Sequence, residues 1–188
     1  MMKYIGAVLM FLFCSLPLPG ITLHTTGGYA KNVTTWENQP AVIQQEFQID
    51  IGLELPIYSV LSGEAALGYH VLEDAYLSGS TVLRGYSATG LTLKLNCLIP
   101  AGNRFRLGFS LSGGAWYARY ARTPQVFFFI KSEAAAAAEA ALYKPFPWIL
   151  RINIPAAVIF RKDIEQQLSA GISFSIGIPL GVSHEAHN

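Results

Sequence analysis

Charged residues are scarce in this chain of 188 residues. Asp, Glu, Lys and Arg together form 13% of the sequence, and the formal net charge is +1. That share is about half of what soluble proteins usually carry, so a soluble domain of this composition would have little polar surface. A near-neutral chain with no basic patch also lacks the electrostatic footprint of nucleic-acid binding, and we expect no nucleic acid among its partners.

Long apolar runs are missing as well. Hydrophobic residues reach 52% of the chain. After the first twenty residues, however, no unbroken run approaches the roughly 20 residues that a membrane-spanning helix needs. The apolar residues alternate with polar ones instead, which favours strands over membrane helices.

Cysteine is almost absent, and catalytic motifs are not found. If Cys14 is removed with a signal segment, Cys97 has no partner for an internal disulfide. The sequence contains no G-x-S-x-G, H-E-x-x-H or phosphate-loop motif. The histidines, which do not have the spacing of metal ligands, are His24, His70, His184 and His187. We expect a protein that is not an enzyme and that has no metal and no cofactor.

The first twenty residues resemble a secretory signal. Lys3 provides the positive charge, residues 5–13 form a short apolar core, and residues 16–20 end it. We expect residues 1–20 to be a signal peptide, with cleavage after Gly20 or after Ala30. Cys14 lies where a lipoprotein signal carries its acylated cysteine, but the preceding Phe13 is large where a small residue is expected.

Strict alternation is clearest over residues 46–55. Phe47, Ile49, Ile51, Leu53 and Leu55 alternate with polar residues or glycine, so one face of this strand is apolar and the other polar. The same pattern returns over residues 167–178. Strands of about nine to eleven residues are long enough to cross a bilayer when tilted, whereas soluble domains usually have strands of five or six.

Eight segments follow this pattern. They cover residues 21–30, 44–55, 63–72, 82–98, 104–120, 125–130, 146–160 and 167–182. An even number places both chain ends on one side of a membrane, as in bacterial single-chain barrels. We therefore predict an all-β protein, an eight-stranded antiparallel transmembrane β-barrel over residues 21–182, followed by a polar tail at 183–188.

Two features interrupt the strand pattern. Residues 132–143 are rich in alanine, with Ser132 available as an N-cap, and predict a short helix in a loop; a low-complexity linker is the alternative. Pro155 and Pro179 remove backbone donors, so each is expected to mark a bulge or a strand end.

Ionisable residues lie on the polar faces of the predicted strands. The turn at 56–62 brings Glu54 near Glu64, and the turn at 99–103 brings Lys94 near Arg106. The predicted lumen cluster comprises Glu54, Glu64, Lys94, Arg104, Arg106 and Arg151, and further lumen-facing residues are Glu46, Asp50, His70 and Asn153. This cluster is either a charged gate or an ion-pair network that fills the barrel. We favour the network, because unpaired charges in a narrow lumen are unfavourable.

Small and aromatic residues complete the pattern. Many lumen positions are Gly or Ser, which indicates either a partly open lumen or room for larger side chains from other strands. Tyr117, Phe146 and Trp148 lie near predicted strand ends, where aromatic girdles occur in membrane barrels.

On these residues the chain resembles the small outer-membrane β-barrels represented by the OmpW and OmpX families. The resemblance rests on the signal segment and on long alternating strands such as 47–55 and 168–182. It implies insertion into the outer-membrane bilayer by the barrel assembly machinery. Such proteins usually end on an aromatic residue, whereas this chain ends on Asn188, a departure that fits a lineage with relaxed rules such as spirochaetes.

Three functions follow from this resemblance and from the residues. The first is a narrow pore for small, including apolar, solutes. The second is a closed surface barrel that acts through its loops, chiefly 32–42, 73–81 and the alanine-rich segment. The third is a soluble periplasmic barrel that binds an apolar ligand, which requires apolar residues facing inward. The sequence names neither a solute nor an oligomeric state.

Overall fold

The computed structural model describes residues 20–35, 40–77, 80–142, 147–162 and 166–180. The predicted signal peptide, apart from Gly20, and the predicted polar tail at 183–188 lie outside these ranges. Within the described ranges no helix is long and apolar enough to cross a membrane.

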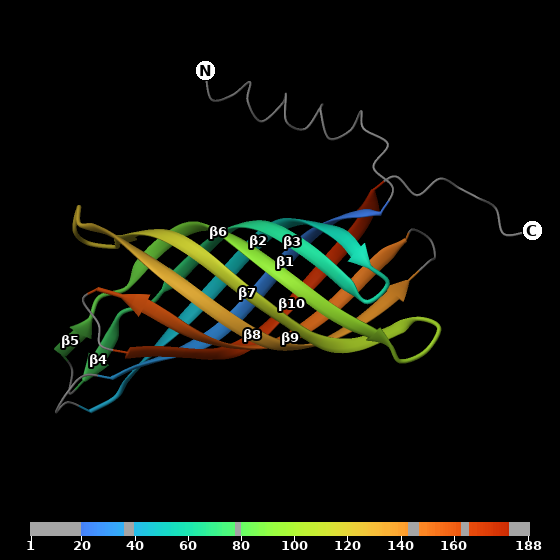
Figure 1. The fold of residues 1–188 in the computed structure, drawn as a ribbon. Helices are drawn as coiled ribbons and strands as arrows, with labels where there is room; N and C mark the ends of the chain where they lie inside the picture. Colours follow the sequence, from blue (N-terminus) through green and yellow to red (C-terminus); the bar gives the residue numbers. More distant parts are fainter. Residues whose placement is uncertain (1–19, 36–39, 78–79, 143–146, 163–165, 181–188) are drawn as a thin grey trace, which may run out of the picture.

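Eight long strands form a closed antiparallel barrel (Figure 1). They are β1 (Ile21–Thr35), β2 (Val42–Tyr58), β3 (Leu61–Leu72), β6 (Tyr86–Pro100), β7 (Phe105–Tyr120), β8 (Val126–Leu142), β9 (Trp148–Arg161) and β10 (Gln166–Leu180). The barrel closes where β1 pairs with β10, from Ile21 opposite Leu180 to Thr35 opposite Gln166. The predicted all-β class, the closed antiparallel barrel and the number of barrel strands are confirmed.

The two ends of the barrel differ. Strands β2 and β3, β6 and β7, and β8 and β9 connect at the end where β1 begins and β10 finishes, which we call the turn end. The opposite, loop end carries a small hairpin of β4 (Ala75–Leu77) and β5 (Ser80–Leu83) (Figure 1). The predicted strand over 82–98 therefore starts too early, because β6 begins at Tyr86.

The predicted helix at 132–143 is wrong. Residues 132–142 belong to β8, which has 17 residues and pairs with β7 on one side and β9 on the other, and Tyr143 lies outside the described residues. Helix propensity is a weak preference per residue, and two continuous hydrogen-bonded ladders outweigh it. Strand periodicity also places Lys131, Glu133 and Glu139 on the same inner face.

The two prolines behave differently. Pro179 lies in β10 opposite Thr22, one residue before the described residues end, so the expected strand end there stays a prediction. Pro155 lies inside β9, and the expected bulge or strand end is wrong. Ala156 pairs with Ala170 and Asn153 with Ser173 in one unbroken register, but the two positions between them are unpaired. Proline, which has no N–H to donate, interrupts the ladder without shifting it.

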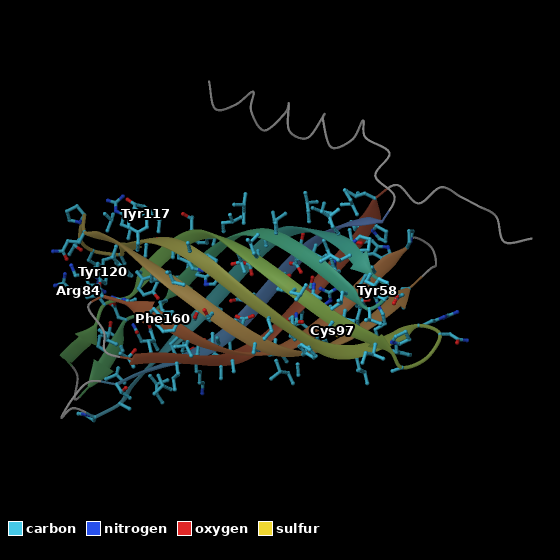
Figure 2. The ribbon with its side chains drawn as sticks, in the orientation of Figure 1. Tyr58, Arg84, Cys97, Tyr117, Tyr120 and Phe160 are labelled. Carbon is cyan, nitrogen blue, oxygen red and sulfur yellow. The ribbon has the colours of Figure 1, made fainter. Side chains whose placement is uncertain are left out.

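The outer face of the barrel is apolar. Figure 2 shows side chains such as Tyr117 and Phe160 pointing away from the barrel, with 44% and 58% of their surface exposed. The outward-facing residues include Ile49, Ile51, Leu67, Leu91, Leu93, Phe109, Ile130, Ile154 and Phe174. Polar side chains face inward, the reverse of a soluble ligand-binding barrel. Trp148 also faces outward, whereas Phe146 lies outside the described residues.

Candidate functional site

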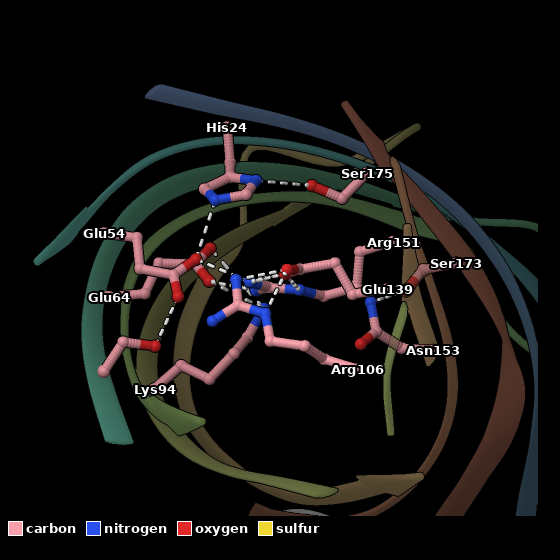
Figure 3. Close-up of polar contacts among 11 residues, drawn as sticks. His24, Glu54, Glu64, Lys94, Arg106, Glu139, Arg151, Asn153, Ser173 and Ser175 are labelled. Atoms are coloured by element: carbon pink, nitrogen blue, oxygen red, sulfur yellow. Dashed lines mark hydrogen bonds and ion pairs between the residues drawn. The ribbon is translucent and has the colours of Figure 1, made fainter. Parts of the chain in front are cut away.

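A network of polar side chains crosses the lumen near the turn end (Figure 3). Each of the eight barrel strands contributes one member. In strand order from β1 to β10 these are His24, Glu54, Glu64, Lys94, Arg106, Glu139, Arg151 and Ser175. We refer to these eight residues as the turn-end network.

Arg151 lies at the centre of this network and is 2% exposed. Its Nη2 donates to Glu54 Oε2 at 2.7 Å and to Glu139 Oε2 at 2.6 Å. Its Nη1 lies 3.5 Å from Glu64 Oε2. One guanidinium therefore connects carboxylates from three strands, which the planar fork of arginine allows.

The remaining members of the network give each of these three carboxylates a further partner. Arg106 Nε donates to Glu139 Oε1 at 2.7 Å, and Lys94 Nζ lies 3.4 Å from Glu64 Oε2. His24 Nε2 lies 2.7 Å from Glu54 Oε2, and its Nδ1 lies 3.1 Å from Ser175 Oγ. Three carboxylates thus face three permanent cations, so the buried charges are balanced.

The structure places most, but not all, of the predicted cluster in this network. Glu54 pairs directly with Glu64 in the β2–β3 ladder, as the turn at 56–62 predicts. Lys94 and Arg106 both contribute to this network but are not ladder partners, because Lys94 lies opposite Ser112 and Arg106 opposite Pro100. Arg104 is exposed in the turn at 101–104, outside the lumen and outside β7, so its predicted place in the cluster is wrong.

A second polar group lies in the middle of the lumen. Glu46 accepts from Asn32 Nδ2 at 2.7 Å and from Lys131 Nζ at 3.2 Å. His70 lies between two carboxylates, with Nδ1 2.6 Å from Glu46 Oε1 and Nε2 3.5 Å from Asp50 Oδ1. The predicted lumen residues Glu46, Asp50 and His70 are therefore brought together.

Asn153, the remaining predicted lumen residue, lies apart from that group. It is buried, and its Nδ2 donates to Ser173 Oγ at 3.2 Å across the β9–β10 ladder. Its partner is a neutral hydroxyl, so Asn153 fills space beside the charged residues without pairing with them.

Towards the loop end an aromatic cluster fills the lumen. Its residues are Leu72, Tyr86, Ala88, Trp116, Ala118, Phe129 and Ile159, with Tyr120 and Phe127 packed against them. The rings of Trp116 and Phe129 stack with centroids 6.1 Å apart. Arg161 covers the cluster, with its guanidinium carbon 4.2 Å from the centre of the Phe127 ring and its Nη2 donating to Tyr120.

The small lumen residues make room for this packing. An added Cβ at Gly68 would lie 2.5 Å from Trp116 Cη2, and one at Gly90 would lie 2.5 Å from the same indole. A cavity of about 30 Å³ remains between the polar groups, lined among others by Asp50, His70 and Trp116, which is room for one or two waters. Of the two interpretations of the small residues, the structure fits room for larger partners.

Sequence reasoning missed four central lumen residues. Lys131 and Glu139 fell outside the predicted strands because of the alanine-rich segment between them. His24 lies in the predicted strand 21–30, where the alternation is weak. Trp116 lies in the predicted strand 104–120, but the sequence did not assign it to the lumen. The even spacing of Lys131, Glu133 and Glu139 was the signal that could have placed β8, because it is a strand period.

No group of His, Cys, Asp and Glu within the described ranges is arranged to hold a metal ion. The arrangement therefore offers ion pairing and packing, and the carboxylates of the lumen are taken up by arginine, lysine and histidine partners.

Sequence comparison finds no match: no protein-family model fits the chain, and no curated protein matches it. Similarity appears among solved structures. Neisserial surface protein A (NspA) superposes with a TM-score of 0.55 at 11% identity, covering 86% of this chain and 97% of NspA. Ail, the attachment invasion locus protein of Yersinia pestis, solved with the heparin analogue sucrose octasulfate, gives a TM-score of 0.43 at 12% identity over 85% of this chain and 97% of Ail. The fold of the chain is that of the small eight-stranded outer-membrane β-barrels.

Proposed function

We propose that this chain is an outer-membrane β-barrel with a closed lumen, and that it meets its partners through its loop end. One observation carries the proposal: side chains fill the lumen between its two mouths, and a larger space of about 340 Å³ lies at the turn-end mouth, lined among others by Thr22, Glu54 and Arg106. The turn-end network, the Glu46–His70–Lys131 group and the aromatic cluster follow one another, and the cavity between them holds about 30 Å³. The pore predicted from the sequence gains no support from so small a cavity.

The outer face supports a membrane setting. Soluble proteins rarely expose continuous apolar patches beyond a few hundred Å². Here the barrel strands other than β1 present exposed large apolar side chains outward, for example Ile51, Leu93 and Ile154. The predicted signal peptide and the fold shared with NspA support export to an outer membrane.

The loop end is the remaining surface for partners. It carries the β4–β5 hairpin and the connection at 121–125. The alanine-rich segment, included among the candidate loops in the sequence analysis, is part of β8 and no longer belongs to this surface. The partner at the loop end is not specified by these residues.

Conductance tests the closed lumen. The folded protein, purified from membranes and inserted into planar bilayers, is expected to give no single-channel steps in KCl or in salts of larger ions. A wide porin treated in the same way shows that insertion and recording work. Regular steps from the heat-shifted, folded form of this protein would contradict a closed lumen.

Trypsin accessibility tests the orientation. Arg84 and Arg122 are exposed at the loop end, and Arg104 is exposed at the turn end. If the loop end faces outward, trypsin added to intact cells cuts at Arg84 or Arg122 and leaves Arg104 uncut. The variant Arg104→Gln is the matched control, since its fragments should be unchanged. Cleavage at Arg104 alone would contradict the orientation.

A further inference from the structure

A groove on the outer face of the barrel runs across five neighbouring strands. Its lining residues include Lys31 and Val33 of β1, Leu168 and Ala170 of β10, Ala156 and Val158 of β9, Ser132 and Ala134 of β8, and Leu111 of β7. The groove has a volume of about 700 Å³. Elsewhere the same face presents large side chains such as Ile51, Leu67 and Leu93.

The floor of the groove is one row of paired residues. Leu111 pairs with Ala134, Ala134 with Ala156, Ala156 with Ala170, and Ala170 with Lys31. Three successive alanines in the row lower the surface relative to the larger residues around it. The row therefore forms a continuous track that ends at the ammonium group of Lys31.

The track descends from the loop end towards the middle of the barrel. Lys31 is four residues from Thr35, where β1 ends. At the other end of the row, Leu111 is nine residues from Tyr120, where β7 ends. Because strands of a barrel are tilted, a row of paired residues crosses the barrel obliquely. One end of the groove is thus near the rim and the other is deep in the apolar belt.

The rim end of the groove is polar. Lys31 pairs with Gln45 in the β1–β2 ladder, and Tyr29 Oη donates to Gln45 Oε1 at 3.3 Å. The Tyr29 ring packs against Phe47 at 5.3 Å between centroids, an aromatic pair of the kind found where barrels meet lipid headgroups. Along β1, Lys31 is the next outward-facing residue after Tyr29 in the direction of the loop end. Among the described residues it has no hydrogen bond or ion pair.

We propose that this groove holds an acyl chain of a lipid with a net negative headgroup, and that Lys31 binds its phosphate. The inference rests on the proposed membrane setting. The depth of the two ends matches a lipid, with the charge at headgroup level and the alanine track below it. Charge complementarity selects an anionic lipid, because a cation near a membrane surface attracts such headgroups.

A second copy of the chain fits the groove less well. Within the barrel strands every described Asp and Glu side chain faces the lumen, so an apposed outer face would leave Lys31 without a counter-ion. Glu73, an exposed carboxylate, follows the end of β3. Its backbone N–H donates to the Gln45 carbonyl, so it lies on the side of Gln45 away from Lys31. A lipid phosphate can approach Lys31 from the groove side.

Native mass spectrometry tests the proposal. The folded protein is released from detergent micelles that contain equal amounts of dioleoyl phosphatidylglycerol and dioleoyl phosphatidylcholine. We expect adducts of the anionic lipid to exceed those of the neutral-headgroup lipid about five-fold, the contribution of one lysine near a membrane surface. Lys31→Gln should remove the preference, and Ala156→Phe should reduce adducts of both lipids.

Two matched variants test whether losing any outward cation, or enlarging any outward alanine, has the same effect on lipid binding. Arg119→Gln removes another exposed, outward cation near the loop end, and Ala65→Phe enlarges an outward alanine on β3. Both should retain the lipid preference. Equal retention of the two lipids by the unchanged protein, or a preference that survives Lys31→Gln, would overturn the proposal. So would a lipid-free dimer as the main species, which would assign the groove to a second copy.

The failure of this inference is distinguishable from failure of the proposed function. Gel mobility of unheated and boiled samples reports whether a barrel has folded in detergent. A folded barrel without lipid preference overturns the groove assignment alone. A protein that folds only in plain buffer overturns the membrane setting and the groove assignment together.

Discussion

Glu139 is bound from both sides by arginine, with Arg151 on one oxygen at 2.6 Å and Arg106 Nε on the other at 2.7 Å. The two arginines differ in environment. The Arg151 side chain is 2% exposed and the Arg106 side chain is 39% exposed. The same carboxylate therefore has one partner deep in the lumen and one at its turn-end mouth.

Replacing Arg151 should therefore be much more damaging than replacing Arg106. Arg151→Met leaves three buried carboxylates without their shared cation, and breaking a buried pair in this way costs about 3–5 kcal/mol of unfolding free energy. Arg106→Gln removes a half-exposed partner and should cost about 1 kcal/mol or less. Urea unfolding in lipid vesicles measures both. Equal losses would contradict the central position of Arg151.

Trp116 packs over Gly68. Gly68→Ala introduces a Cβ that would lie 2.5 Å from Trp116 Cη2 and closer still to Asp50 Oδ1, and overpacking of this kind costs about 1–3 kcal/mol. Gly113→Ala is the matched control, since nothing lies within 4 Å of its added Cβ, and it should be close to neutral. The double variant Gly68→Ala with Trp116→Phe should regain part of the loss in the same unfolding assay. If the double variant loses as much unfolding free energy as Gly68→Ala alone, the indole is excluded as the cause.

The alternation of the strands made the barrel predictable from sequence. Period two is a direct consequence of strand geometry, so segments such as 47–55 identified strand and outer face together. The lumen pairing of Glu54 with Glu64 followed from one short turn. Lys94 and Arg106 both belong to the turn-end network, but they are not direct partners across the β6–β7 hairpin, because its register is set by a turn whose boundaries the sequence gives only approximately.

The alanine-rich segment shows that the sequence of one strand does not contain the pairing with neighbouring strands that decides its structure. Alanine favours a helix locally, but β8 is stabilised by hydrogen-bonded pairing with β7 and β9, which lie outside the segment. Glu139 could be placed only after that segment was known to be a strand. Local helix propensity therefore hid Glu139, the carboxylate that both arginines of the turn-end network bind.

Enlarging alanines along β8 should show a period of two. Ala135 and Ala137 face the lumen and are 5% and 6% exposed, so Leu at either position should destabilise the barrel by about 1–3 kcal/mol. Ala136 and Ala138 face outward, and Leu should be tolerated at both. Heat-dependent gel mobility and urea midpoints compare the four variants. A response that repeats every three or four residues would indicate a helix instead.

The rate at which Cys97 is labelled tests whether lipid or water surrounds the outer face of the barrel. It is a half-buried residue near the turn end of β6, opposite Phe109 in the ladder. In a Cys14→Ser background it is the single cysteine of the chain. Maleimide labelling requires a thiol that water and the reagent can reach, and hydrocarbon surroundings exclude water, so labelling in vesicles should be slow and should become fast after unfolding.

A cysteine introduced at the exposed Ser59 of the β2–β3 turn is the control for this labelling and should react in both states. The control is made in a background that also carries Cys97→Ser, so that only the turn position is read. Rapid labelling of Cys97 in the folded protein would argue for water around the barrel.

The turn-end network takes one side chain from every barrel strand, including Ser175 of the last strand and His24 of the first. No intermediate with seven strands can complete it. A strand displaced by one residue would turn its charged member to the outside of the barrel. Premature closure and slipped registers thus leave charges of the network without partners. The complete, correctly registered barrel is the first arrangement of these strands in which every member of the network has its partner, so the network favours that register over slipped ones.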